Sequence, residues 1–388
     1  MNNTVNTLHY RMRVIHSLTD VEQKQWDELL QLSSNPNPFL SYAFLHALHE
    51  SGSACERTGW RPCYLTLWDE NAVVAAMPLY EKAHSYGEYV FDWAWADAYH
   101  RHGLDYYPKL LSAIPFTPVS GNRLIAKNLL TQQLLIKELI RFQDEGSYSS
   151  THILFPTEQE SIALKDAGFL LRQGIQFHWI NHGYENFDSF LSTLEQKKRK
   201  NIRAERRKVA QEGVEFRHIQ GQDMTETDWQ VFKSCYDHTY AEHNSTPYLN
   251  LDFFLRIGRT MPEHIHLVFA TLNNQVIAAS LLIHNEQTVY GRYWGCLKEI
   301  DCLHFETSYY QAIEFCIANK IKVFEGGAQG EHKIARGFLP QKTTSAHHLT
   351  EPGFSDAVAL FLQRETGGVE QYLSDLNDRT PFKSTTLK

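Results

Sequence analysis

Leu267-Val-Phe-Ala-Thr-Leu-Asn-Asn-Gln-Val-Ile-Ala-Ala-Ser-Leu-Leu-Ile283 contains two apolar runs on either side of an Asn-Asn pair. Apolar runs rich in β-branched residues around such a pair predict a β-hairpin. A similar stretch lies earlier in the chain, Tyr64-Leu-Thr-Leu-Trp-Asp-Glu-Asn-Ala-Val-Val-Ala-Ala-Met-Pro-Leu-Tyr80. In both, the second run starts with two β-branched residues followed by Ala-Ala. The sequence therefore predicts the same hairpin twice.

Matching segments flank both hairpins, which favours a duplicated domain over chance similarity between two hairpins. Each hairpin follows a helical pattern and precedes a third strand, a second helix and a short strand. These segments are 20–32, 88–95, 129–143 and 152–155 in the first half, and 225–240, 288–294, 307–319 and 321–324 in the second. The repeated order predicts a mixed α/β (α+β) fold with two tandem domains, each a mixed twisted sheet flanked by helices. A break near 175–185 places these domains at 1–180 and 181–388.

The composition is that of a globular protein and narrows the possible functions. The 388 residues carry a net charge of −8, so any polyanion would have to bind a local basic patch. The six cysteines form no CxxC pair and no zinc spacing with histidines, so we expect reduced thiols and no metal. A run of about 18 apolar residues and a secretory signal are both absent, so we expect a cytoplasmic protein without a membrane span.

One such basic patch lies near the start of the second half. Residues 197–208 contain eight Lys or Arg and one acidic residue. Apolar residues from Phe187 onward continue through this segment at helical spacing, and Gly213 follows it, which predicts one helix with outward cations. A solvated helix face is the ordinary interpretation of such a run. In an acidic protein it is also the natural site for the phosphates of a nucleotide, coenzyme A or tRNA, with Lys200, Arg203, Arg206 and Arg207 as candidates.

A glycine-rich segment follows the last short strand, with Gly326, Gly327 and Gly330 directly before four polar residues. Those four are Glu331, His332, Lys333 and Arg336. One interpretation is a strand-to-helix turn with a solvated charged cluster. We favour an active-site loop, because ligands of α/β sheets usually bind beyond the carboxyl ends of the strands.

Two further segments contain candidate binding residues. Arg292 and Trp294 end the third strand of the second half; they could position a planar substrate group or simply pack in the core. Asp92, Trp93 and Asp97 follow the corresponding strand of the first half, where they could bind an amine or form a hydrogen-bonded surface loop. His347 and His348 lack a third ligand at useful spacing, so we expect them on opposite faces of a strand. No GxSxG, P-loop or GxGxxG motif occurs.

Three stretches, 37–45, 301–315 and 324–340, resemble bacterial predicted N-acyltransferases of peptidoglycan biosynthesis or recognition, within the Fem aminoacyltransferase group. The resemblance covers nearly the whole chain. It implies tandem GNAT-type domains that hold an acyl donor between splayed central strands and transfer the acyl group directly to an amine. The usual coenzyme A pattern, Gln/Arg-x-x-Gly-x-Gly/Ala before a helix, is missing, which leaves aminoacyl-tRNA or another acyl carrier open as the donor.

The expected reaction assigns provisional roles to the candidates. An attacking ammonium must lose a proton, for which we expect Glu331 or His332, with His304 behind them. The oxyanion needs a preorganised donor, such as a backbone N–H near Gly326 and Gly327 or the Arg336 guanidinium. The remaining substrate-binding candidates are Arg292, Trp294, Lys333, Asp92, Trp93 and Asp97. We therefore expect an N-acyltransferase or aminoacyltransferase that uses an acyl-CoA or a charged tRNA and a small amine acceptor.

Two other functions fit the same residues. A non-catalytic protein could use this site to bind an anionic or cell-wall-related ligand without turnover. A tRNA-binding accessory protein could use the basic segment alone, and its affinity would then depend steeply on salt.

Overall fold

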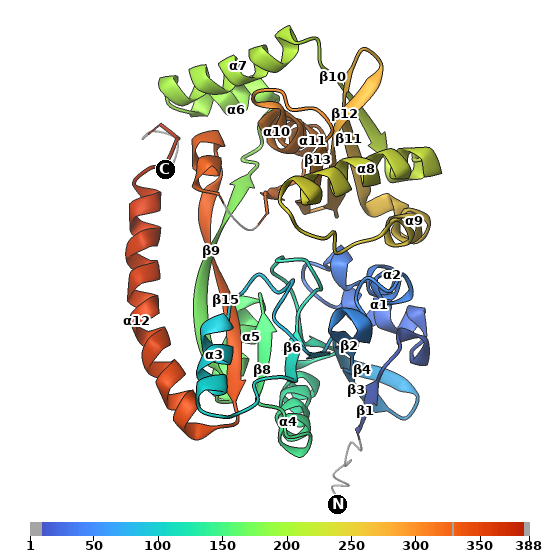
Figure 1. Ribbon diagram of the computed structural model, residues 1–388, viewed down its shortest axis with the longest axis vertical. Coiled ribbons are helices and arrows are strands. Elements are labelled where there is room, and N and C mark those ends of the chain that lie inside the picture. The colour runs from blue at the N-terminus through green and yellow to red at the C-terminus, as the bar shows by residue number, and fades with distance from the viewer. Residues whose placement is uncertain (1–9, 328–329, 384–388) are drawn as a thin grey trace, which may run out of the picture. The chain divides into compact units, whose positions relative to one another are not determined.

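The computed structural model describes residues 10–327 and 330–383 and consists of two compact units. One unit comprises Met1–Gln173 and Thr344–Thr366, and the other Gly174–Thr343 and Gly367–Lys388. The chain therefore passes between the units within β9 (Leu170–Ile180), within β15 (Leu339–Leu349) and within α12 (Pro352–Asn377) (Figure 1). The sequence predicts two continuous domains, 1–180 and 181–388. In the structure, residues 344–366 belong to the first unit instead.

The first unit contains two groups of strands with helices around them (Figure 1). A four-stranded sheet has the order β1-β3-β4-β7, and a second group has the order β15-β8-β6-β5-β2, in which β6 and β8 are parallel. Its core combines aliphatic residues with large aromatic ones, among them the fully buried Trp26, Trp60, Tyr64 and Tyr80. The strands are β1 (Arg11–Ile15), β2 (Trp60–Pro62), β3 (Tyr64–Asp69), β4 (Ala72–Met77), β5 (Tyr80–Lys82), β6 (Lys109–Ser112), β7 (Ile125–Ala126) and β8 (Ser150–Leu154). The helices are α1 (Gln23–Gln31), α2 (Tyr42–Glu50), α3 (Trp93–Arg101), α4 (Leu129–Glu145) and α5 (Glu158–Asp166).

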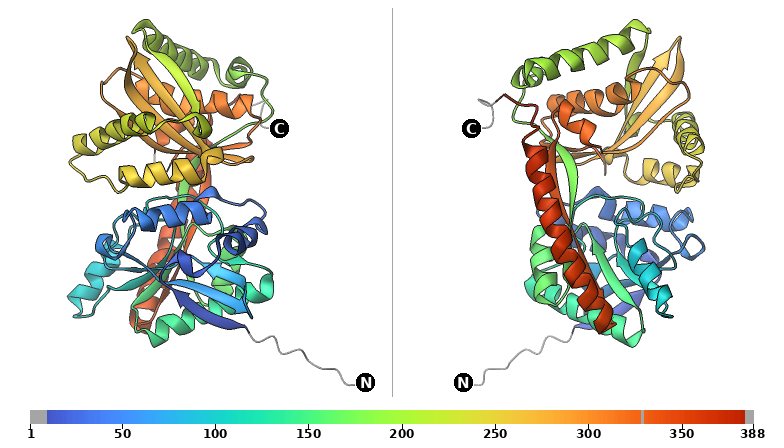
Figure 2. Two further views of the ribbon diagram at one scale, coloured as in Figure 1. Left: turned by 90° about the vertical axis from the view of Figure 1, so that its right-hand side faces the viewer. Right: turned by 60° about the vertical axis from the view of Figure 1, so that its left-hand side comes forward.

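The second unit is built on one mixed sheet of order β10-β11-β12-β13-β14-β9 (Figure 2). Only β13 and β14 pair in parallel; the other neighbours are antiparallel. Trp179, Phe190, Phe324 and Phe338 are fully buried in its core. The strands are β10 (Glu215–Gln220), β11 (Ile265–Leu272), β12 (Gln275–His284), β13 (Thr288–Cys296) and β14 (Val323–Glu325). The helices are α6 (Phe187–Thr193), α7 (Gln196–Gln211), α8 (Glu226–Glu242), α9 (Leu251–Thr260), α10 (Leu303–Phe305) and α11 (Gln311–Ala318).

Both predicted hairpins form, as β3–β4 and β11–β12. In the second hairpin, Asn273 and Asn274 have φ values of 51° and 63°, the left-handed backbone that a tight hairpin turn requires. The predicted third strand of the second half is also present, as β13. The predicted strand at 88–95 is wrong, because this segment is an irregular loop that leads into α3 at Trp93. The Glu88 and Asp92 carboxylates of that loop are buried and contact Lys109 instead of lying in a sheet.

The predicted single helix that starts at Phe187 and includes the basic segment consists of two helices, α6 and α7, so the prediction of one continuous helix is wrong. The basic segment lies within α7. The break falls at Leu194, which has extended backbone (ψ 157°), is fully buried and forms a β-bridge to Phe382. Burying this leucine between the two helices therefore outweighs helical continuity. Gly213, with φ 78°, follows α7 as predicted.

The residues that the structure describes include no helix with the length and apolar character needed to cross a membrane.

Candidate functional site

The candidate site of the second unit lies where the β13–β14 ladder ends. The two strands pair through Thr288–Val323, Val289–Phe324 and Tyr290–Glu325, after which β14 stops and β13 continues to Cys296. On the other side of β13, Leu281 of β12 pairs with Tyr293 and Leu282 with Gly291, so Arg292 is the extra residue of a β-bulge. Bulges redirect side chains and occur often beside active sites. The ladder therefore opens at Arg292, beside the loop that follows β14.

The segment after this loop is a short 3-10 helix, η7 (Glu331–Arg336). It ends at Gly337, which has φ 91° and where a Cβ atom would lie 2.8 Å from the Phe190 ring, so a glycine is required. The turn buries Lys333 and Arg336 and leaves Glu331 and His332 exposed. The four polar residues predicted as one cluster are therefore divided between two environments.

Lys333 is the buried cation of this site, with 2% of its surface exposed. Its Nζ donates a hydrogen bond to the Gly327 carbonyl at 2.9 Å. Burial lowers the pKa of the Lys333 ammonium to about 8. The group is therefore mostly charged at neutral pH, yet it can lose its proton far more easily than an exposed lysine.

Two imidazoles lie close to this ammonium. Burial, followed by the charges of His332, Lys333 and Arg336, lowers the pKa of His304 to about 4. The His304 ring lies 4.7 Å from that of Trp294 and 5.3 Å from that of Tyr309. His332 Nε2 is 3.2 Å from the Tyr309 hydroxyl. Burial, with Arg336 and Lys333, also lowers the pKa of His332, so both imidazoles are neutral at pH 7.

A third imidazole, His178, belongs to the same cluster but was not predicted as a site residue. His178 lies on β9 directly opposite Glu325, the last residue of β14. Burial and the Lys333 charge lower the pKa of His178 to about 4. The sequence predicts a strand at 176–180, in which His178 alternates with Phe177 and Trp179, but nothing local indicates that Lys333 packs nearby.

Arg336 connects η7 to neighbouring helical segments of the second unit. Its guanidinium donates to Glu205 Oε1 at 2.8 Å, to the Tyr310 hydroxyl at 3.1 Å and to the His332 carbonyl at 2.8 Å. It also stacks on Phe305 at 3.5 Å. These contacts fix the carbonyl of His332 and join η7 to α7, so Arg336 holds the site's framework.

Glu331 is not brought to the cluster. Its carboxylate is exposed, accepts a hydrogen bond from the Tyr372 hydroxyl at 2.5 Å and pairs with Arg379 at 2.8 Å. Both partners belong to the C-terminal part of the second unit. The Glu331 carboxylate is therefore engaged by Tyr372 and Arg379 instead of by the cluster around Lys333.

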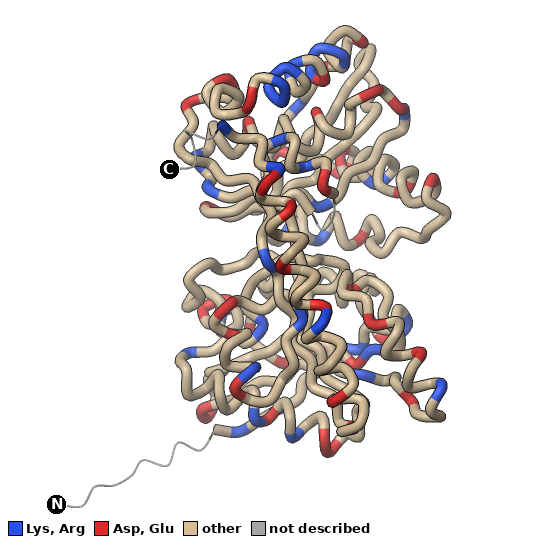
Figure 3. The backbone as a smooth tube through the Cα atoms, turned by 90° about the vertical axis from the view of Figure 1, so that its left-hand side faces the viewer, with Lys and Arg blue, Asp and Glu red and all other residues tan. Residues whose placement is uncertain are grey.

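The cations of α7 divide into paired and exposed groups. Arg206 contacts Glu306 and Glu314 at 2.9 and 2.8 Å, and Arg203 contacts Asp188 at 2.8 Å. Figure 3 shows Lys and Arg positions recurring along α7. Among them, Lys200 and Arg207 are exposed. A cavity of about 450 Å³ lies at the α6–α7 junction; its lining residues are Asn186, Phe187, Asp188, Leu191, Arg203, Arg206, Arg207 and Glu314.

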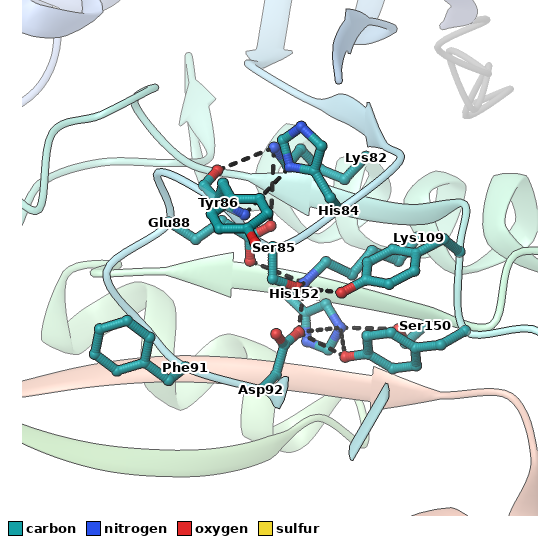
Figure 4. A network of polar contacts seen from close by, with 12 residues as sticks. Lys82, His84, Ser85, Tyr86, Glu88, Phe91, Asp92, Lys109, Ser150 and His152 are labelled. Atoms are coloured by element: carbon teal, nitrogen blue, oxygen red, sulfur yellow. Dashed lines mark hydrogen bonds and ion pairs between the residues drawn. The ribbon is translucent and has the colours of Figure 1, made fainter. Parts of the chain in front are cut away.

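The candidates of the first half belong to the first unit and have different surroundings. Asp92 is 3% exposed and accepts hydrogen bonds from Lys109 and from the Tyr106 hydroxyl (Figure 4). Trp93 is exposed, and Asp97 pairs with Arg101 at 3.1 Å on the surface. Asp92 is therefore a buried network residue. No group of three or more His, Cys, Asp or Glu side chains within residues 10–327 and 330–383 could hold a metal ion.

Comparison with protein families assigns most of the chain to one family. Residues 17–384 match the FemAB-like family, described as peptidoglycan biosynthesis/recognition. A search of the curated proteins finds no significant match.

Solved structures share the fold at low sequence identity. FemX is 11% identical, with a TM-score of 0.56 over 89% of this chain and 100% of FemX. L-PGS from Bacillus licheniformis is 10% identical, with a TM-score of 0.54 over 88% of this chain and 97% of L-PGS. A conserved protein of unknown function from Bacteroides thetaiotaomicron is 12% identical, with a TM-score of 0.52 over 88% of this chain and 100% of that protein.

These likenesses, together with the mixed ladders flanked by helices, confirm the predicted class, a mixed α/β fold. The family match covers nearly the whole sequence and agrees with the resemblance drawn from residues 37–45, 301–315 and 324–340. The chain therefore belongs to the FemAB-like family of peptidoglycan biosynthesis or recognition proteins.

Proposed function

We propose that the second unit transfers an acyl or aminoacyl group to an amine of a cell-wall precursor, with the site at the open end of the β13–β14 ladder. The observation that carries this proposal is the buried Lys333 ammonium, which lies among His178, His304 and His332. A cation in a water-poor site stabilises a developing oxyanion much better than an exposed cation does. The family description supports a cell-wall precursor as acceptor.

His332 is the proposed proton acceptor. It is neutral at pH 7 and exposed, whereas His304 is more deeply buried and has a pKa of about 4. Burial raises the pKa of the Tyr309 hydroxyl to about 12, so this group stays protonated beside His332 and can orient its ring. A base whose pKa lies nearer the working pH is the more effective one.

The reaction balances with these groups. The nitrogen of the acceptor amine attacks the carbonyl of the donor ester or thioester, and the oxyanion lies at Lys333. The C–N bond forms and the C–O or C–S bond to the carrier breaks. The amine proton passes to His332, and His332 returns it to the departing oxygen or sulfur.

We propose an aminoacyl-tRNA as donor ahead of an acyl-CoA. The exposed cations of α7, with Lys200 and Arg207 among them, offer contacts for a phosphate backbone. The sequence pattern that usually holds the coenzyme A pyrophosphate is absent. Arg203 and Arg206 already pair with carboxylates, so their part is to shape the cavity at the α6–α7 junction.

The test is a transfer assay on the full chain with a panel of charged tRNAs and acyl-CoAs, followed by mass spectrometry of the acceptor. We expect Lys333→Met to lower kcat/KM by about 10²- to 10³-fold. We expect His332→Gln to lower it by about 10²- to 10⁴-fold. Lys320→Met and His182→Gln change exposed residues of the same unit and serve as matched controls.

Two results would contradict the proposal. If ligands bind but no donor is turned over, the protein is a binding module. If Glu331→Gln is more damaging than His332→Gln, the carboxylate is the base and the pair with Arg379 opens during the reaction.

A further inference from the structure

The loop between β5 and α3 in the first unit has an inverted polarity. Its acidic residues Glu88 and Asp92 are each 3% exposed. Its aromatic residues are the exposed ones: Tyr86 59%, Tyr89 39%, Phe91 59% and Trp93 41%. A loop in water normally shows the opposite arrangement, because burying charge and exposing large apolar groups are both unfavourable.

A buried lysine holds the acidic side of this loop in place (Figure 4). Lys109 of β6 is fully buried and donates to Ser85 Oγ at 2.8 Å, to Glu88 Oε2 at 2.8 Å and to Asp92. Lys82 of β5, also fully buried, lies 3.9 Å from Glu88 Oε1 and 3.4 Å from the Tyr86 carbonyl. The buried lysines Lys82 and Lys109 therefore both hold this loop in place.

The far end of the loop has its own anchor. Arg172 donates to the Phe91 carbonyl at 2.7 Å and forms a bidentate pair with Glu365 at 2.9 and 2.8 Å. The Tyr86 and Trp93 rings contact each other edge to face at 5.0 Å. The aromatic surface is therefore held at both of its ends.

The backbone of the loop is strained at Tyr89. This residue has φ 63°, a left-handed conformation that is unfavourable for a bulky side chain and that glycine or asparagine adopts more easily. Such strain tends to persist where a site requires it. Here it presents an aromatic ring at a position where glycine would relieve the backbone.

The exposed face of the loop has no charge at neutral pH. Between residues 83 and 96 the charged side chains are Glu88 and Asp92, and both are buried. Burial and the nearby Lys82 lower the pKa of His84, so that it too is neutral. The surface therefore offers phenol, indole and phenyl groups without a formal charge.

We propose that the loop formed by residues 83–93 docks the first unit onto the interfacial region of a lipid bilayer. Tyr and Trp favour this region because their rings are apolar and their hydroxyl or N–H can stay hydrated, while Phe enters the acyl boundary. A charge-free face matches this environment, because a charge there would have to be desolvated. A rigid loop also has little conformational entropy left to lose on docking.

Other occupants fit these observations less well. A sugar or a nucleotide is recognised through hydrogen-bonding side chains as well as rings, and the acidic groups of this loop are already bonded to lysines. A protein interface would favour cations such as arginine among its aromatics, and residues 83–96 include no lysine or arginine. The inference stands apart from the proposed chemistry of the second unit.

The experiment is co-sedimentation of the full chain with phosphatidylcholine vesicles, with and without phosphatidylglycerol. We expect binding to both kinds of vesicle, and a loss of about tenfold or more in the partition coefficient for Tyr86→Ser/Phe91→Ser. The matched control is Leu129→Ser/Leu130→Ser, which removes two leucines of the same unit that are 75% and 48% exposed and should leave binding unchanged. Circular dichroism checks that each variant is folded.

Three outcomes would overturn the proposal: absence of vesicle binding, equal losses in the loop and control variants, and self-association that the loop variant abolishes. Binding that requires phosphatidylglycerol and disappears in high salt would assign the contact to a charged surface elsewhere. Transfer to a water-soluble amine should remain intact in the loop variant, so vesicle binding and catalysis are tested separately.

Discussion

Lys109 and Lys333 are both buried ammonium groups, but their partners differ. Lys109 contacts two carboxylates and a hydroxyl, and these charges raise its pKa despite its burial. Lys333 bonds a backbone carbonyl, and burial lowers its pKa to about 8. The first lysine keeps its proton because carboxylates surround it, whereas the second loses its proton more easily than an exposed lysine does.

Replacing Lys109 should therefore destabilise the first unit strongly. In Lys109→Met, Asp92 remains buried without its lysine and Glu88 keeps only the more distant Lys82, a change that costs about 3–5 kcal/mol. Chemical denaturation measures this loss, and Lys127→Met, which changes an exposed lysine of the same unit, is the control. A loss below about 1 kcal/mol would show that the two carboxylates are not held by this ammonium.

Lys333→Met should change the dependence of stability on pH. The unfolded lysine titrates near 10.5 and the folded one near 8, so between these values the unfolded chain binds more protons. Lys333 therefore makes the unfolding free energy rise with pH in this window, by up to about 3 kcal/mol. Denaturation of both proteins at pH 7.5 and 10 measures this rise, and a parallel response of the variant would contradict the expectation.

The residues of the site could be predicted from the sequence only in part. The Gly-rich segment indicated Lys333 and His332 because polar residues directly follow a strand. His178 and Tyr309 come from distant segments, and only their burial next to η7 gives them a role. The pairing of Glu331 with Arg379 likewise depends on a long-range contact that no local pattern encodes.

At the scale of elements, α7 combines a structural and a binding surface. The exposed cations Lys197, Lys200 and Arg207 should contribute to the affinity for a polyanion. Replacing all three with glutamine should lower the slope of log K against log salt for tRNA by up to about 2 units. Filter binding over a range of salt measures this slope, and Lys298→Gln/Lys320→Gln/Lys322→Gln, which removes three exposed cations of the same unit, controls for net charge. An unchanged slope would place the tRNA site elsewhere.

Regular elements followed the sequence where the local pattern and the tertiary partner agree. Alternating apolar residues around a turn gave both hairpins, and helical spacing gave α4 and α8. The prediction failed at 88–95, because two buried lysines bind its carboxylates, and at Leu194, because a buried contact interrupts the helix. A further departure is the π-helical turn η6 (Glu306–Tyr310), which brings Glu306 to Arg206.

At the scale of the whole molecule, several buried histidines are neutral because burial disfavours their protonated, charged form. Burial lowers the pKa of His266 and His347 to about 3 and that of His49 and His178 to about 4. Below about pH 6.5 the unfolded chain binds protons that the folded chain does not, so the unfolding free energy falls on acidification. We expect a clear drop in Tm between pH 7.5 and 5 at constant ionic strength. Equal Tm values would mean that these imidazoles are hydrated.

The three passages of the chain between the units limit how the units can be separated by truncation. Residues 345–349 of β15 pair with β8, so a fragment that stops at residue 173 would leave an unmatched sheet edge where β15 belongs. A single cut in the gene can release neither unit whole. Both units therefore have to be translated as one continuous chain, and a change in the expression of one is a change in the expression of the other.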